Sequence, residues 1–207
     1  MINIKNIILD LGGVLINLDY NKTNEALSKL GYANGFTKAK QINLFDKLEE
    51  GKVSELDFLK EFNTLAGANH ENKTIIDAWN AILLDFPYER LALLKELNEN
   101  YRVFLFSNTN TIHIKEVNAE LKKQHSIDNL NGYFEKVYLS HELGIRKPKI
   151  EGFKHIVDTN NLTLKETLFI DDSPQHIEGA KKAGLEAEWL DLNKEDIHEM
   201  LTRLSLI

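Results

Sequence analysis

The stretch NIILDLGG, residues 6–13, decides how this chain folds. Its first four residues predict a short buried strand, which ends on the carboxylate of Asp10. The two glycines that follow tolerate unusual backbone angles, so the main chain can turn closely around that carboxylate. A second stretch, TLFIDD at residues 167–172, ends in the same way on Asp171 and Asp172. Two strands that deliver three carboxylates to one sheet edge predict a site for a hard cation.

The composition narrows the possible partners. The chain has 207 residues, a formal net charge of -7 and no cysteine. This charge argues against nucleic acid and anionic membranes as partners, and the missing cysteine leaves only oxygen or imidazole to bind a metal. No apolar run has the length of a membrane span, and no secretion signal stands out. We therefore expect a cytoplasmic protein that binds a small molecule and is a monomer or weak homodimer.

The segment from Thr23 to about Leu84 predicts helices only. Apolar residues recur there at helical spacing, as in the run that ends with Trp79 and Leu83. Ser54, followed by an acid three residues later, predicts the start of one helix. We expect a compact helical block with its own core, which the chain leaves at Phe86-Pro87.

The rest of the chain predicts helices that alternate with short apolar strands. The expected strands, after the one ending at Asp10, are 103–106, 137–140, 167–170 and one centred on Trp189 and Leu190. This alternation predicts an α/β fold with a parallel sheet that is covered on both faces. Because ligands bind at the carboxyl ends of such strands, we expect Asp10, Ser107 and the Asp171-Asp172 pair to lie close together.

Four segments in this order resemble the four motifs of the haloacid dehalogenase (HAD) superfamily. They are Asp10-Leu-Gly-Gly-Val14, Ser107-Asn108, Lys147 before Pro148, and Asp171-Asp172. Each segment is weak alone, but four in order across nearly the whole chain are specific. The Leu-Gly-Gly and Arg-Lys-Pro details are most similar to the branch of sugar-phosphate phosphatases that includes glucose-1-phosphate phosphatases.

The resemblance implies an architecture with two parts. The core would be a Rossmann-like, five-stranded parallel sheet in the order 3-2-1-4-5, formed by residues 1–16 and 88–207. Residues 17–87 would form a small inserted α-helical cap that closes over the core, excludes water and selects the substrate.

The resemblance also implies a Mg²⁺-dependent phosphatase for a small phosphate monoester, with a sugar phosphate as the expected substrate. Asp10 would be the nucleophile and would form an aspartyl-phosphate intermediate. The metal would be held by Asp10, Asp172 and the backbone carbonyl of Gly12, with Asp171 as a second ligand or an outer-shell partner.

The phosphoryl group would be held by donors from the other motifs. Lys147 would supply a fixed positive charge. The Ser107 hydroxyl, the Asn108 amide and the backbone N–H groups of Leu11 and Gly12 would donate hydrogen bonds.

Gly12 is a departure from most phosphatases of this superfamily, which carry a second aspartate there as general acid and base. Such a group contributes about 10²–10⁴ in rate. We expect Asp19, a cap residue or an ordered water to substitute, and we expect a slow, broad phosphatase that favours good leaving groups such as anomeric phosphates. Gly12 also argues against a phosphomutase.

Two other functions remain open from the sequence. A metal-independent 2-haloacid dehalogenase would use the same ester chemistry on Asp10, although the Asp171-Asp172 pair favours phosphate and Mg²⁺. A phosphate-binding module could keep the cleft without turnover. Of the remaining polar residues, we expect His176 to be structural or at the surface, and Arg146 to guide an anion or form a loop salt bridge.

Overall fold

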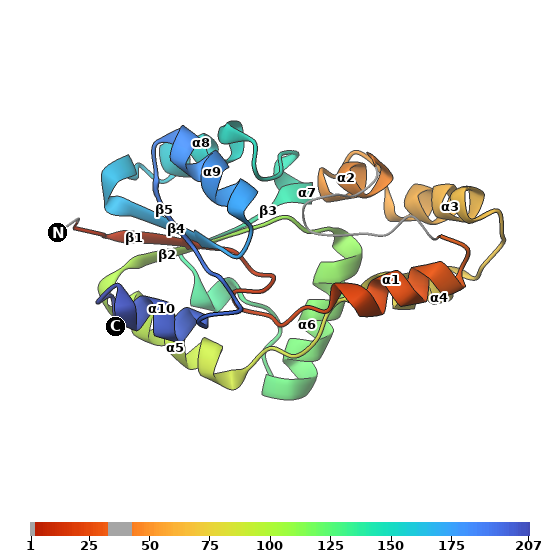
Figure 1. Ribbon diagram of the computed structural model, residues 1–207, viewed down its shortest axis with the longest axis horizontal. Coiled ribbons are helices and arrows are strands. Elements are labelled where there is room, and N and C mark those ends of the chain that lie inside the picture. The colour runs from red at the N-terminus through yellow and green to blue at the C-terminus, as the bar shows by residue number, and fades with distance from the viewer. Residues whose placement is uncertain (1–2, 33–42) are drawn as a thin grey trace.

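The computed structural model describes residues 3–32 and 43–207 and is drawn in Figure 1. Within these residues, five strands form one parallel sheet in the order β3-β2-β1-β4-β5. The strands are β1 (Asn6–Leu9), β2 (Arg102–Ser107), β3 (Lys136–Leu139), β4 (Thr167–Asp171) and β5 (Glu186–Trp189). The predicted α/β class, the parallel sheet and the strand order are confirmed.

Helices cover both faces of the sheet (Figure 1). One face carries α5 (Tyr88–Asn100), α6 (Thr111–His125) and α10 (Ile197–Arg203), and the other carries α8 (Ile150–Thr159) and α9 (Pro174–Ala183). Because successive strand residues point to opposite faces, β1 sends Ile7 and Leu9 into one core and Ile8 into the other. Of the described helices, none is long and apolar enough to cross a membrane.

No prediction from the sequence covers helix α6, although signals of this helix are present in the sequence. Asn110 caps its first turn, with a side chain that accepts hydrogen bonds from the backbone of Ile112 and His113. Val117 and Leu121 continue the buried face that Ile112 begins. The polar residues between them dilute the helical pattern, so the cap is the stronger signal.

Strand β5 differs from the prediction. It spans Glu186–Trp189, so Leu190 lies beyond its end and the predicted centre at Trp189 and Leu190 is wrong by about two residues. β5 is an edge strand with glutamates at two of its four positions. An edge strand is solvated on one side, and it therefore lacks the continuous apolar run that marks an inner strand.

Four helices form a separate layer beyond one end of the sheet (Figure 1). They are α1 (Tyr20–Lys29), α2 (Asn43–Glu49), α3 (Glu55–Ala66) and α4 (Asn72–Asn80). Their shared core is aromatic, with the Trp79 ring 4.5 Å from Phe45 and 5.8 Å from Phe58 between centroids. The Ser54 side chain accepts a hydrogen bond from the backbone of Asp57, so the predicted helix start is confirmed. Residues 33–42 of the predicted block lie outside the described part.

Two linkers connect the α1–α4 layer to the sheet and pair with each other. Leu18 of the first linker forms an antiparallel bridge with Leu83 of the second. The backbone N–H of Asn17 donates to the carbonyl of Asp85 at 3.0 Å, and their side chains form a further hydrogen bond of 3.0 Å. The prediction that Leu83 belongs to a helix is therefore wrong, because α4 ends at Asn80 and the chain then pairs with the other linker.

His113 of α6 links the sheet layer to the α1–α4 layer. Its Nε2 lies 3.2 Å from the backbone oxygen of Trp79, and its Nδ1 lies 3.3 Å from the amide nitrogen of Asn110. These partners fix the neutral tautomer that carries its proton on Nε2. The ring also stacks on Trp79, with centroids 4.9 Å apart. Burial lowers the pKa of His113 to about 4, although the hydrogen bond to Trp79 acts in the opposite direction.

We predict that His113 makes the folded protein less stable as the pH falls. Because its folded pKa of about 4 lies below the ordinary 6.5, the unfolded chain binds an extra proton between these values. The contribution of His113 to the unfolding free energy is fully present above pH 6.5 and is lost toward pH 4. The change in unfolding free energy is up to about 3 kcal/mol.

Urea unfolding at several pH values tests this prediction. His113→Gln keeps a hydrogen-bonding side chain but cannot titrate, so it should remove this part of the pH dependence. Substitution of His198, which is exposed on α10, should preserve it. If the unfolding free energy of His113→Gln changed with pH as steeply as that of the wild-type protein, the prediction would be contradicted.

Candidate active site

The register of the sheet brings two acidic strand ends together. Leu9 of the central strand β1 lies opposite Ile170 of β4. The next residues, Asp10 and Asp171, therefore leave the sheet as neighbours at its carboxyl edge. The backbone N–H of Asp10 donates to the carbonyl of Ile170 at 3.0 Å, which extends this pairing. Asp10 is only 3% exposed and Asp171 is fully buried.

The ammonium group of Lys147 joins these two carboxylates. Its Nζ lies 2.8 Å from Oδ1 of Asp10 and 2.6 Å from Oδ2 of Asp171. The side chain is fully buried, and Nζ also lies 5.5 Å and 5.4 Å from the ring centroids of Phe106 and Phe169. A buried ammonium needs such partners, because its removal from water costs several kcal/mol. Three residues from distant parts of the sequence thus form one ion-paired cluster.

The carboxylate of Asp171 has further partners in α9. It accepts a hydrogen bond of 2.8 Å from the backbone N–H of Ser173. Both of its oxygens lie 3.0 Å from Nδ1 of His176, which is 1% exposed. The surface interpretation of His176 is therefore wrong. Its position one turn into the helix after Asp171 is the sequence signal that points to this contact.

The segment that follows Asp172 also begins a helix. Ser173 is the N-cap residue of α9 and Pro174 is its first helical residue. The rigid strand-to-helix turn sets the direction in which Asp171 and Asp172 leave β4.

Asp10, Asp171 and His176 bring potential metal ligands within 4.8 Å of one another. However, the Lys147 ammonium bonds to both carboxylates of this trio. A divalent cation between Asp10 and Asp171 would have to compete with this fixed charge. The geometry therefore favours a cation on the other side of Asp10, toward Asp172.

Asp172 lies against the turn that follows Asp10. A Cβ atom placed on Gly13 would lie 2.3 Å from Oδ2 of Asp172. Gly13 also has a φ angle of +81°, which other residues rarely adopt. The second glycine of the turn is thus needed both for its backbone angle and for the space that Asp172 occupies.

Ser107, the last residue of β2, and Asn108, the residue after it, differ in their contacts. Ser107 is 3% exposed and faces the cavity described below. The side chain of Asn108 bonds to the backbone of Lys147 in both directions, accepting from its N–H at 2.8 Å and donating to its carbonyl at 2.9 Å. This contact, which the sequence does not predict, fixes the backbone that carries the buried ammonium. The predicted contact of Asn108 with phosphate stays a prediction.

The turn that follows Asp10 is also held locally. The backbone N–H of Leu11 donates to Oδ1 of Asp10 at 2.7 Å, so that oxygen has two donors in this structure. Gly12 follows, and a Cβ atom placed there would lie 2.7 Å from Cδ1 of Leu18. A linker side chain therefore fills the space beside the position where a second aspartate is missing.

A cavity of about 70 Å³ lies between the strand ends and the α1–α4 layer. Its lining includes Gly12 and Ser107 on one side and Leu18, Tyr20 and Glu49 on the other. This volume has room for a few water molecules or for a group of the size of a phosphoryl group. A larger cavity of about 670 Å³ reaches Gly13 and Asp172 from the side of the linkers.

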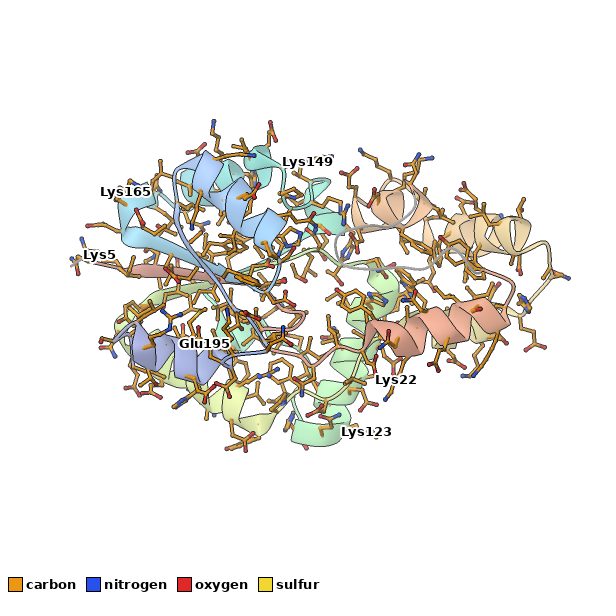
Figure 2. The ribbon with its side chains drawn as sticks, in the orientation of Figure 1. Lys5, Lys22, Lys123, Lys149, Lys165 and Glu195 are labelled. Carbon is orange, nitrogen blue, oxygen red and sulfur yellow. The ribbon has the colours of Figure 1, made fainter. Side chains whose placement is uncertain are left out.

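Helix α2 docks on the loop that carries Lys147. Arg146 binds Asp46 at 2.5 Å and Glu49 at 2.7 Å, so the loop salt bridge is confirmed for Arg146. Lys149, labelled in Figure 2, binds Glu50 from the same side of α2. The two cations that flank Lys147 are therefore engaged with the α1–α4 layer.

The charges and donor types at the strand ends fit Mg²⁺. One ammonium cannot balance the three carboxylates of Asp10, Asp171 and Asp172, so the cluster attracts a further cation. The carboxylate of Asp172, the Asp10 carboxylate and the nearby backbone carbonyls are hard oxygen donors, which Mg²⁺ prefers. The carboxylate of Asp172, which meets the turn at Gly13, would lie at such a cation.

Known proteins resemble this chain along most of its length. A family described as haloacid dehalogenase-like hydrolase matches residues 4–184. D-ribitol-5-phosphate phosphatase of Bacteroides thetaiotaomicron is 35% identical over 191 residues, which cover 88% of this chain and 90% of that protein.

Solved structures agree in fold and length. The wild-type HAD family enzyme from the same organism, in complex with magnesium and inorganic phosphate, has a TM-score of 0.84 at 36% identity and covers 95% of this chain and 98% of its own. A HAD-like family hydrolase from Porphyromonas gingivalis has a TM-score of 0.86 at 30% identity, with 98% of both chains covered.

We predict that Lys147→Met lowers the unfolding free energy by about 3–5 kcal/mol, because it leaves two buried carboxylates without their cation. Lys149→Met is the matched control. Its ion pair is half exposed on the lysine side, and such pairs contribute about 0–1 kcal/mol. Urea unfolding in EDTA measures both effects without a bound metal. A loss below about 1 kcal/mol for Lys147→Met would contradict the ion-paired cluster.

Proposed function

The chain belongs to the haloacid dehalogenase-like hydrolases, and on this basis we propose that it is a Mg²⁺-dependent phosphatase for phosphate monoesters of small sugars or polyols. The observation that carries this proposal is the buried Lys147, whose ammonium binds the Asp10 carboxylate at the sheet edge, directly before the residues Leu11 and Gly12 that line the cavity. The identified relative from Bacteroides thetaiotaomicron is a phosphatase for a polyol phosphate, which supports the same substrate class here.

The two layers correspond to two proposed domains with different roles. Residues 1–16 and 88–207 would be the hydrolase core, and residues 17–87 would be the cap, of which 33–42 lie outside the described part. The paired linkers are the proposed hinge, because they are the two covalent connections between the layers. Closure of the cap would exclude water from the phosphoryl group.

Asp10 is the proposed nucleophile. One carboxylate oxygen attacks phosphorus, the bond from phosphorus to the leaving oxygen breaks, and the departing alkoxide takes a proton from water. Water then attacks the phosphorus of the aspartyl-phosphate, which releases inorganic phosphate and restores the Asp10 carboxylate. The Lys147 ammonium and the N–H of Leu11 hold Oδ1 of Asp10, so the carboxylate is already oriented before the substrate binds.

Donors around the cavity would stabilise the transferring group. Ser107 ends β2 and Asn108 follows it, while Leu11 and Gly12 follow Asp10. Their hydroxyl, amide and backbone N–H groups are the proposed donors to the oxygens of the transferring group. Lys147 would add a positive charge next to Asp10, whose carboxylate its ammonium binds.

Asp10, Asp172 and the backbone carbonyl of Gly12 are the proposed metal ligands. Bound Mg²⁺ would offset the repulsion between the Asp10 carboxylate and the phosphate dianion. Asp171 is the proposed outer-shell partner, because its oxygens bind Lys147, Ser173 and His176.

The partner is proposed to be a small phosphorylated metabolite, not nucleic acid. The net charge of -7 supports this restriction, since polyanions would be repelled. We further propose a cytoplasmic enzyme that acts as a monomer or weak homodimer.

Phosphate release from p-nitrophenyl phosphate and D-ribitol 5-phosphate tests the function. We expect turnover with Mg²⁺, its loss in EDTA, and a decrease of at least about 10³-fold for Asp10→Asn, because the amide is a poor nucleophile. The exposed Asp128→Asn is the matched control and should keep full activity. Halide release from 2-haloacids that survives EDTA would indicate the dehalogenase, and no turnover of any substrate would indicate the binding module.

The missing acid at Gly12 gives a second prediction. Gly12→Asp alone would push its side chain against Leu18, so we expect the double variant Gly12→Asp/Leu18→Ala to make room for the acid. Its kcat should rise by about 10-fold or more for an alkyl phosphate, whose leaving group needs a proton, and much less for p-nitrophenyl phosphate. Leu18→Ala alone controls for the loss of packing. An equal effect on both substrates would contradict this explanation of Gly12.

A further inference from the structure

Glu49 is a charged residue of α2 that the proposed chemistry does not use. On the basis of the phosphatase function proposed above, we infer that Glu49 selects the leaving group of the substrate. It would restrict the enzyme to phosphate esters of uncharged, hydroxyl-bearing alcohols and would exclude esters that carry a second negative charge.

The position of Glu49 is the first reason. It lines the same 70 Å³ cavity as Gly12, Ser107 and Asn108, although it comes from the α1–α4 layer. A phosphoryl group on the strand-end side of this cavity would therefore direct its ester oxygen toward the layer that carries Glu49. A leaving group that extends across the cavity from the strand ends would meet this side chain on the opposite wall.

The electrostatics of the cavity wall are the second reason. Among the described residues that line this cavity, Glu49 carries the sole formal charge. His113 also lines it, but its pKa of about 4 leaves the ring neutral near pH 7. Apolar side chains such as Leu18 and Ile82 line the same cavity, and they weaken the screening of charge inside it.

Arg146 holds Glu49 in place. Its Nη2 lies 2.7 Å from Oε2 of Glu49, whose side chain is 9% exposed. This ion pair offsets the cost of burying the carboxylate and restricts its rotation. A carboxylate accepts hydrogen bonds but does not donate them, so its natural partners are the hydroxyl groups of a sugar or polyol. A second carboxylate or phosphate would be repelled instead.

Asp46 distinguishes this role from a purely structural one. It binds the same Arg146, through Nη1 at 2.5 Å, but its side chain is 38% exposed and it does not line the cavity. Loss of either acid therefore removes one ion pair between α2 and the Lys147 loop. Only loss of Glu49 also changes the charge at the leaving-group end of the cavity.

The test compares Glu49→Gln with Asp46→Asn on two substrates in the presence of Mg²⁺. D-ribitol 5-phosphate is the uncharged polyol ester, and 2-phosphoglycolate is the ester with a second negative charge. We expect Glu49→Gln to lower the ratio of kcat/KM for the polyol ester to that for 2-phosphoglycolate by about 10-fold to 100-fold, the range of a hydrogen bond to a charged group. Asp46→Asn should leave this ratio within about 2-fold of wild type.

A second variant covers the case in which Glu49→Gln does not fold. Glu49→Asp keeps the charge but shortens the side chain, so it should still reject 2-phosphoglycolate while its KM for the polyol ester rises. The inference would be overturned if kcat/KM changed in parallel for both substrates in both Glu49 variants, or if Asp46→Asn changed the ratio as much as Glu49→Gln. The proposed function would stand in either case. Absence of turnover by the wild-type enzyme on every ester would overturn the proposed function and this inference with it.

Discussion

The buried ammonium of Lys147 is the interaction on which the rest of this structure depends. It lies between the carboxylates of Asp10 and Asp171, which come from adjacent strands of the sheet. Its desolvation is tolerable only because both carboxylates bind it. The reciprocal hydrogen bonds of Asn108 then fix the backbone of Lys147, so all four motifs form one mutually dependent cluster.

The same cluster connects the chemistry to the α1–α4 layer. Arg146 and Lys149 flank Lys147 in sequence and bind acids at the end of α2. A movement of this layer would therefore pull on the loop that carries the ammonium. Leu18 couples the layers from the other side, because it belongs to the paired linkers and fills the space beside Gly12. The position of this layer and the arrangement of the site are thereby linked.

Much of this arrangement could be predicted from the sequence. The apolar strands that end on Asp10 and Asp171 predict the sheet, since buried parallel strands have a clear pattern and ligands bind at their carboxyl ends. The strand order follows from the resemblance to the HAD superfamily and agrees with the structure.

Other features could not be predicted, for physical reasons. β5 is short and carries glutamates because an edge strand is partly solvated, and α6 has a weak apolar pattern. The contacts of Asn108, Leu18 and Glu49 depend on which side chains meet after folding. Hydrophobic periodicity identifies elements, but it contains no information on pairs that come from different layers.

The central claim is that the carboxylate held by Lys147 is the one that reacts. Borohydride reduction during turnover of a phosphate ester, followed by peptide mass spectrometry, tests it most directly, because an acyl phosphate is reduced to an alcohol and a free carboxylate is not. The account predicts that the side chain of residue 10 alone is converted from aspartate to homoserine, and only when substrate and Mg²⁺ are both present. Reduction at Asp171 or Asp172, or turnover without any reduced peptide, would contradict it.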